Sequence, residues 1–82
     1  MAKVKLFGIY SLEVNKDELI IEADTIEAIL LKLSSIEPNL TIKRLKGSLI
    51  FVNDKNISEL NMFKTKVKPD DNISILSPIA GG

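Results

Sequence analysis

Near the amino terminus, apolar and polar residues alternate in two short stretches separated by a polar segment. Residues 3–10 begin with lysines alternating with apolar residues, which predicts a strand. Residues 18–23 predict a second strand and residues 11–17 the connection, so we expect a hairpin because consecutive strands are usually neighbours. In such a strand Phe7 would point to the face opposite that of the two preceding apolar residues, Val4 and Leu6. It therefore marks either a contact patch on an exposed face or a residue packed beneath a loop.

The spacing then changes to that of an amphipathic helix over residues 25–35. Apolar side chains recur at i, i+3, i+4 and i+7, in the order Ile26, Ile29, Leu30 and Leu33. Asp24 and Thr25 are both residues that cap helices, and Glu27 stands three residues after Asp24, as in a capping box. Pro38 stops any continuation. We expect this helix to cover one face of a sheet.

The second half of the chain contains two more strand patterns. Residues 39–48 are polar and end in a turn signal, and residues 49–52 are a continuous apolar run, which predicts a strand buried on both faces. Residues 53–56 predict a tight turn, and residues 57–63 fit either a short strand or a helical turn. The last strand begins at Ile73, and Leu76 lies on its opposite parity.

Three lysines at alternate positions, Lys64, Lys66 and Lys68, stand before the last strand. They can protect the edge of a sheet from pairing with other chains, or they can form a basic patch for nucleic acid. The first interpretation is favoured, because eleven basic residues balance eleven acidic ones in the whole chain.

Composition narrows the function classes further. The 82 residues, 45% of them hydrophobic, suit one small globular domain. Cysteine and histidine are absent, so the chain lacks a thiol nucleophile and the commonest general base and metal ligand, and we expect no metal site. No apolar run reaches the length of a membrane-spanning helix, and the amino terminus does not resemble a signal peptide. We expect a cytoplasmic protein with no membrane or nucleic-acid partner.

The order strand, strand, helix, strand, short element, strand predicts an α+β roll. We expect a mixed sheet of four to five strands with one main helix packed across one face. Because a single helix covers a single face, the other face stays partly open and is available for binding. The predicted domain covers residues 1–76, and residues 77–82 form an extended tail.

The tail ends in Gly81-Gly82. A glycine carboxylate has no Cβ beside it, so the active site of another protein can close around the last peptide units. Pro78 fixes one backbone torsion near the start of the tail, and Ile79 follows it with an apolar side chain. The pattern predicts a stiff apolar root and a slim reactive tip. The alternative is an ordinary frayed chain end or a cloning remnant.

Taken together, the element order and the ending resemble the ubiquitin-like β-grasp sulfur carriers of the MoaD/ThiS type, above all the MoaD family, the small subunit of molybdopterin synthase. The resemblance rests on four segments that span nearly the whole chain: Val4–Phe7, Asp24–Leu30, Val52–Asn53 and Val67–Gly82. Three residues depart from the pattern. Asp70 stands at the usual turn glycine, Pro69 replaces an aspartate, and Ser77 replaces the first of two prolines.

The resemblance implies that the carboxyl group of Gly82 is the reacting group. An E1-like adenylating enzyme (MoeB type) would activate it with ATP, a sulfur donor system would convert it to a thiocarboxylate, and the large catalytic subunit of molybdopterin synthase would receive the sulfur. The chain itself would bind no cofactor. The residues implied in partner binding are Phe7, Leu76, Pro78, Ile79, Ala80 and Gly81.

Some alternatives remain open at this point. Leu76 also fits an ordinary core position. A ubiquitin-like modifier joined to lysines and a thiazole-pathway (ThiS-like) sulfur carrier share the fold and the paired glycines. A plain interaction module would be indifferent to the loss of Gly82.

Overall fold

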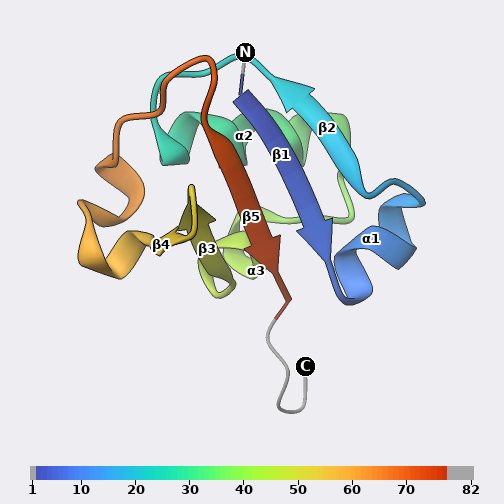
Figure 1. The fold of residues 1–82 in the computed structure, drawn as a ribbon. Helices are drawn as coiled ribbons and strands as arrows, with labels where there is room; N and C mark the ends of the chain where they lie inside the picture. The colour runs from blue at the N-terminus through green and yellow to red at the C-terminus, as the bar shows by residue number, and fades with distance from the viewer. Residues whose placement is uncertain (1, 78–82) are drawn as a thin grey trace.

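A five-stranded mixed sheet with helices on one side forms the domain (Figure 1). The computed structural model describes residues 2–77. In the sheet the strands lie in the order β2-β1-β5-β3-β4; β1 and β5 are parallel, and the other neighbours are antiparallel. Along the chain the elements are β1 (Ala2–Phe7), α1 (Ile9–Val14), β2 (Glu18–Ile21), α2 (Ile26–Ile36), α3 (Ile42–Lys46), β3 (Leu49–Val52), β4 (Lys55–Asn56), η1 (Ile57–Glu59), η2 (Met62–Lys64) and β5 (Asn72–Leu76).

The core lies between the sheet and α2, as the sequence predicts. In β1 every second side chain is buried, and the predicted apolar stripe of α2 is buried too. The helix begins at Ile26 with Thr25 as its cap, whose hydroxyl accepts a hydrogen bond from the Ala28 amide at 3.1 Å. The predicted capping box needs Asp24 as the cap residue and Glu27 three residues later. The cap residue is Thr25, one position farther along the chain, so this pairing is not the one that begins the helix.

The first strand is shorter than predicted, and the segment after it is helical. Gly8 turns the chain out of the sheet with a φ of 68°, and α1 follows where a longer strand and a polar connection were expected. Two of its residues, Tyr10 and Val14, lie one turn apart and are buried. The Tyr10 hydroxyl donates to the Arg44 carbonyl at 3.1 Å and lies 2.5 Å from the Ser48 hydroxyl. These long-range contacts fix α1, and a local strand pattern does not reveal them.

Two predictions in the middle of the chain are also corrected. Residues 39–48 are not only a polar connection, because α3 forms there and Leu40 and Leu45 are fully buried. The strand at residues 49–52 is buried on one face only: in β3 the second and fourth residues point into the core, and the first and third do not. The reason is that the helices cover a single face of the sheet, which Figure 1 shows.

The turn and the short element that follow agree with the sequence. Asn53 and Asp54 both have positive φ, 50° and 73°, which forms the tight hairpin turn between β3 and β4. Residues 57–63 adopt the helical alternative as two short 3-10 turns. Lys66 pairs only with Thr25 in a single antiparallel bridge, so the alternating lysines do not form an edge strand. The edges of the sheet are β2 and β4.

An ion pair links α1 to α3. Both guanidinium nitrogens of Arg44 donate to the Glu13 carboxylate at 2.8 Å, and Arg44 also donates to the Asn39 carbonyl at 2.8 Å. Hydrogen bonding from Arg44 lowers the pKa of Glu13 below its ordinary value. A carboxyl group whose pKa is lower in the folded state stabilises the fold above its unfolded-state pKa, and this contribution is lost as the pH falls through the folded-state pKa.

Glu13→Gln should therefore lower the free energy of unfolding at neutral pH and have no effect in acid, well below the lowered folded-state pKa of Glu13. The loss is small, because both side chains are partly exposed to solvent, which screens their attraction. Urea unfolding of the variant and the parent at both pH values checks this. Glu59→Gln is the control, because Glu59 forms no ion pair within residues 2–77. An equal loss at both pH values would mean that the charge of Glu13 does not matter.

Candidate functional site at the root of the tail

Three apolar side chains form a row across the end of the sheet from which the tail departs. β1 and β5 run in the same direction, so both end at this edge (Figure 1). Phe7 is level with Leu76, and Leu76 is level with Leu49 at the start of β3. Neighbouring strands place such side chains about 5 Å apart. We call Phe7, Leu76 and Leu49 the apolar row.

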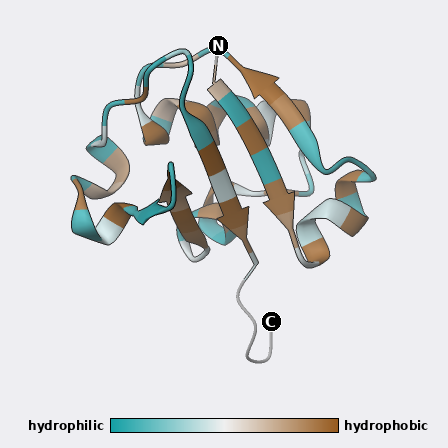
Figure 2. Ribbon diagram, viewed as in Figure 1, coloured by the Kyte–Doolittle hydropathy of each residue, from teal (hydrophilic) through white to brown (hydrophobic). Residues whose placement is uncertain are grey.

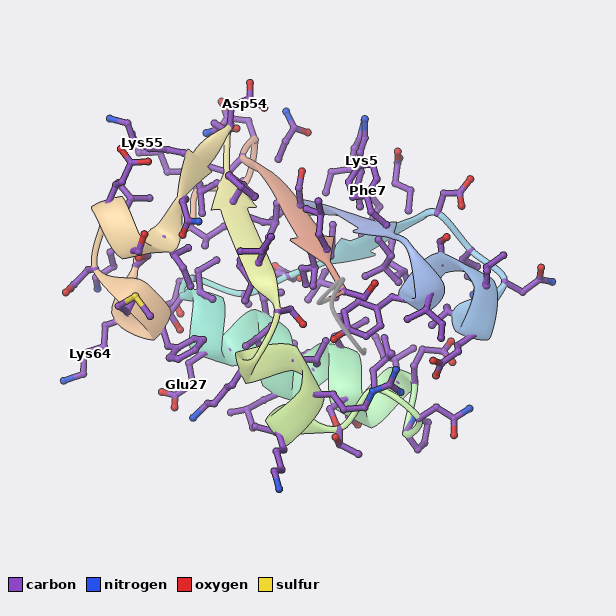
Figure 3. The ribbon with its side chains drawn as sticks, turned by 90° about the horizontal axis from the view of Figure 1, so that it is seen from below. Lys5, Phe7, Glu27, Asp54, Lys55 and Lys64 are labelled. Carbon is purple, nitrogen blue, oxygen red and sulfur yellow. The ribbon has the colours of Figure 1, made fainter. Side chains whose placement is uncertain are left out.

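The apolar row lies on the open face of the sheet. The core-facing residues of β5, Ile73 and Ile75, are 0% exposed, and Leu76, on the opposite parity, is half-buried. Phe7 is 43% exposed and Leu49 45% exposed. Figure 3 shows Phe7 pointing away from the sheet on the side opposite to the helices. Of the alternatives left by the sequence, Phe7 is thus a patch residue and Leu76 is not part of the core.

Farther from the tail, β1 and β5 present polar residues on the same face. Lys5 is level with Ser74, and Lys3 lies 3.8 Å from the Glu18 carboxylate. A depression of about 340 Å³ in this region is lined by Lys5, Phe7, Asn53, Asp54, Asn72 and Ser74. Figure 2 shows the change along β1 and β5, whose carboxyl ends are hydrophobic. The apolar row thus lies at the end of the open face where the tail begins, and the same face also carries exposed Ile20 on β2, level with Lys3, and half-buried Phe51 on β3, level with Ser74.

The root of the tail is held by the turn between β1 and α1. Ser77, the residue after β5, accepts a hydrogen bond at its hydroxyl oxygen from the Ile9 amide at 3.3 Å. The Ser11 hydroxyl donates to the Gly8 carbonyl at 3.0 Å in the same turn. The sequence-predicted residues Pro78, Ile79, Ala80, Gly81 and Gly82 lie outside the described residues.

The site combines residues that sequence reasoning found with residues that it missed. Phe7 and Leu76 were predicted, and the structure brings them together on adjacent strands. Leu49 was missed because its apolar neighbours suggested a strand buried on both sides. Its parity, opposite to that of Ile50 and Val52, could have indicated its exposure once a single covering layer was assumed.

Within residues 2–77 no three Asp or Glu side chains lie close enough to hold a metal ion, and the whole sequence has no His or Cys. No helix in the same part of the chain is long and apolar enough to cross a bilayer. What remains is an apolar docking row next to a strand that continues into the tail.

Comparison with known families assigns the chain. The model of the ThiS family matches residues 4–82, which includes all three residues of the apolar row and the whole tail. The chain belongs to the ThiS family. The match agrees with the resemblance to the MoaD/ThiS type of ubiquitin-like sulfur carrier that the sequence suggested. No curated protein matches this ThiS-family chain in sequence.

Solved structures similar to this ThiS-family chain share its β-grasp fold. Small archaeal modifier protein 1 from Methanosarcina acetivorans is 30% identical, with a TM-score of 0.88 over 99% of this chain and 95% of the other. A chain of the complex between subunits 1 and 2 of the molybdopterin-converting factor from Helicobacter pylori is 25% identical, with a TM-score of 0.61 over 99% and 97%. A chain of the BexX/CysO complex from Amycolatopsis orientalis is 19% identical, with a TM-score of 0.84 over 100% of both.

These matches establish the class of this ThiS-family protein. Its mixed sheet with a helix packed across one face is the ubiquitin-like β-grasp fold, as predicted. Its relatives include a small archaeal modifier protein as well as a chain of the molybdopterin-converting factor, so the family is that of ubiquitin-like sulfur carriers and modifiers. Two of the similar structures are complexes with a second protein, which agrees with a domain that works through partners.

Proposed function

We propose that this protein is a sulfur carrier and serves as the small subunit of molybdopterin synthase in molybdenum cofactor biosynthesis. The observation that carries the proposal is the apolar row at the root of a tail ending in Gly81-Gly82. An exposed apolar patch of this kind is typical of a protein–protein contact. Here it would dock the domain on a partner and direct the tail toward the partner's active site.

The first step is activation of the Gly82 carboxylate by an E1-like adenylating enzyme. A carboxylate oxygen attacks the α-phosphorus of ATP, pyrophosphate leaves, and an acyl-adenylate forms. This gives the acyl carbon a leaving group that a free carboxylate lacks. The nucleotide is bound by the partner, because the chain has no glycine-rich phosphate-binding loop: Gly8 and Gly47 are isolated. The activation takes place in the cytoplasm.

In the second step a sulfur donor system supplies the nucleophilic sulfur. The sulfur attacks the acyl carbon and AMP leaves, so the carboxyl group becomes a thiocarboxylate. The tail then enters the large catalytic subunit, where the sulfur is transferred to cyclic pyranopterin monophosphate. Ala80 and Gly81 would let the active site close around the backbone, while Pro78 and Ile79 would contact its entrance. Phe7 and Leu76 would remain outside as docking contacts.

The relationship to the molybdopterin-converting factor supports this assignment. The related chain from Helicobacter pylori is part of a complex between subunits 1 and 2 of the molybdopterin-converting factor. We infer that the present chain occupies the position of the smaller subunit in an equivalent complex, because it matches that structure over nearly its full length.

A second candidate is a ubiquitin-like modifier joined through Gly82 to lysines of other proteins. It is favoured by the 30% identity to small archaeal modifier protein 1. Both functions begin with the same activated carboxyl group, and they differ in whether sulfur or a lysine amine displaces AMP. A thiazole-pathway carrier would differ from the main proposal only in the recipient of the sulfur.

Intact-mass measurement tests the main proposal. The purified chain is incubated with ATP, an adenylating enzyme of the MoeB type and a sulfur source. The expected product has one oxygen exchanged for sulfur, and it supplies sulfur to cyclic pyranopterin monophosphate when the large subunit is added. Formation of Gly82 isopeptides without the sulfur-containing species would favour the modifier. A chain whose mass never changes would contradict both.

A further inference from the structure

The hydrogen bond at Ser77 joins two parts of the chain that are far apart in the sequence. Ser77 follows the last residue of β5, and Ile9 is the first residue of α1, 68 positions earlier. The Ile9 amide is one of the first amides of a helix, which have no partner within the helix itself. Its donation to the Ser77 hydroxyl oxygen at 3.3 Å gives it one.

Gly8 makes this contact possible in two ways. As the cap residue of α1 it has no side chain to accept the helix amides, and no side-chain cap forms there. A Cβ at Gly8 would also lie 2.4 Å from the Ser77 hydroxyl oxygen, so the hydroxyl occupies the space that glycine leaves. The φ of 68° further disfavours any other residue. Gly8 and Ser77 are therefore complementary in shape as well as in hydrogen bonding.

The contact lies between the apolar row and the tail. Phe7 directly precedes Gly8, and Leu76 directly precedes Ser77. Pro78 comes next. A proline restricts the backbone of the residue before it, here Ser77, to extended conformations. Side chain and backbone of Ser77 are thus both constrained at the point where the docking surface gives way to the tail.

We propose that Gly8 and Ser77 form a clasp that sets the position from which the tail leaves the apolar row, and that Ser77 is a positioning residue for the reaction at Gly82. The inference rests on the proposed function, since it concerns the delivery of that carboxyl group. With the clasp closed, a partner that docks on Phe7 and Leu76 meets the tail root at a fixed place. With the clasp open, the partner must order the root as it binds, which weakens binding.

Loss of the clasp should change KM for the carrier. Once the tail is seated in the partner's active site, the reacting atoms are arranged identically with or without the clasp, so kcat stays the same. The loss of one neutral hydrogen bond at a partly exposed position corresponds to about a three- to tenfold weaker interaction. Ser77→Ala should therefore raise KM for the carrier by about three- to tenfold at unchanged kcat.

The experiment compares Ser77→Ala with two controls. Ser74→Ala removes a serine hydroxyl from β5, three residues before Ser77 and on the open face, where it forms no side-chain hydrogen bond within residues 2–77. Ser77→Thr keeps a hydroxyl at the clasp and should restore the parent behaviour. Pyrophosphate release by a MoeB-type adenylating enzyme with ATP gives KM and kcat. Hydrogen exchange of the Ile9 amide, measured by NMR, reports the clasp directly and does not depend on any partner.

The expected result is faster Ile9 exchange and a raised KM in Ser77→Ala, with neither change in Ser74→Ala. Unchanged Ile9 exchange in Ser77→Ala would overturn the clasp. Faster exchange with an unchanged KM would overturn the positioning role. If the parent chain releases no pyrophosphate with the adenylating enzyme, the proposed function fails. The Ile9 exchange then still decides whether the clasp exists.

Discussion

Deletion of Gly82 is expected to abolish thiocarboxylate formation and to leave the domain folded. The deletion withdraws the carboxyl group from the partner's catalytic centre by one residue, about 3.5 Å. Because misplacement by about 1 Å can already cost a hundredfold in rate, we expect a loss of at least ~100-fold. The core is formed by residues 2–75, so the free energy of unfolding should not change. Intact mass after incubation with ATP, adenylating enzyme and a sulfur source measures the product.

The matched control is Gly82→Ala, which keeps the length of the tail and adds one methyl group beside the carboxyl group. This variant should still react, more slowly than the parent, because the added Cβ crowds the site that closes around the tip. Unfolding of the domain on deletion of Gly82 would mean that the tail is structural. Full sulfur transfer by the shortened chain would mean that Gly82 is not the reacting residue.

Phe7→Ala is expected to weaken binding to the large subunit of molybdopterin synthase by about 10- to 100-fold, because aromatic anchors at the centre of an interface contribute most of its binding energy. Phe7 is 43% exposed and faces away from the core. Its removal should therefore change the free energy of unfolding by about 1 kcal/mol or less. Titration calorimetry with the purified large subunit gives the dissociation constant, and urea unfolding gives the stability.

Leu12→Ala is the matched control for Phe7→Ala. Leu12 lies on α1 and is 79% exposed. Its substitution by alanine therefore removes exposed apolar surface away from the sheet. The dissociation constant of the Leu12→Ala variant for the large subunit should equal that of the parent chain. Equal weakening by both substitutions would indicate nonspecific hydrophobic contact, and no weakening by Phe7→Ala would place the docking surface elsewhere.

The parts of the fold that depend on local patterns were predictable. The stripe of α2 and the alternation in β1 each repeat with the period of their element, and both are buried as expected. The helix α1 was not predictable in the same way. Ile9 and Tyr10 are good strand formers next to a strand, and the turn at Gly8 depends on a backbone torsion that a glycine permits but does not require.

The strand at residues 49–52 shows what a local pattern leaves undecided. Four consecutive apolar residues fit a strand buried on both faces as well as a strand with one apolar face exposed. Only the number of covering layers separates the two, and that number depends on the whole chain. The same exposure places Leu49 in the apolar row.

Two of the three residues of the apolar row followed from the sequence, and the rest of the site needed strand register. The parity of Phe7 and Leu76 indicated a face opposite the core, while a position beneath a loop for Phe7 and a core position for Leu76 stayed open. That they meet each other follows from the parallel pairing of β1 with β5, residues almost 70 positions apart. The contact between Gly8 and Ser77 depends on the same pairing, and no motif in either segment indicates it.

The central place of β5 has a consequence for how the protein is made. β5 lies between β1 and β3, so without it no strand within residues 2–77 pairs with both the amino-terminal pair of strands and the later pair. Nascent chains that still lack β5 cannot complete the sheet, and long-range parallel pairing makes its closure slow. Assembly of the domain thus waits until β5 has been synthesised, and a product that terminates before β5 lacks the strand that carries Leu76 and therefore a complete apolar row.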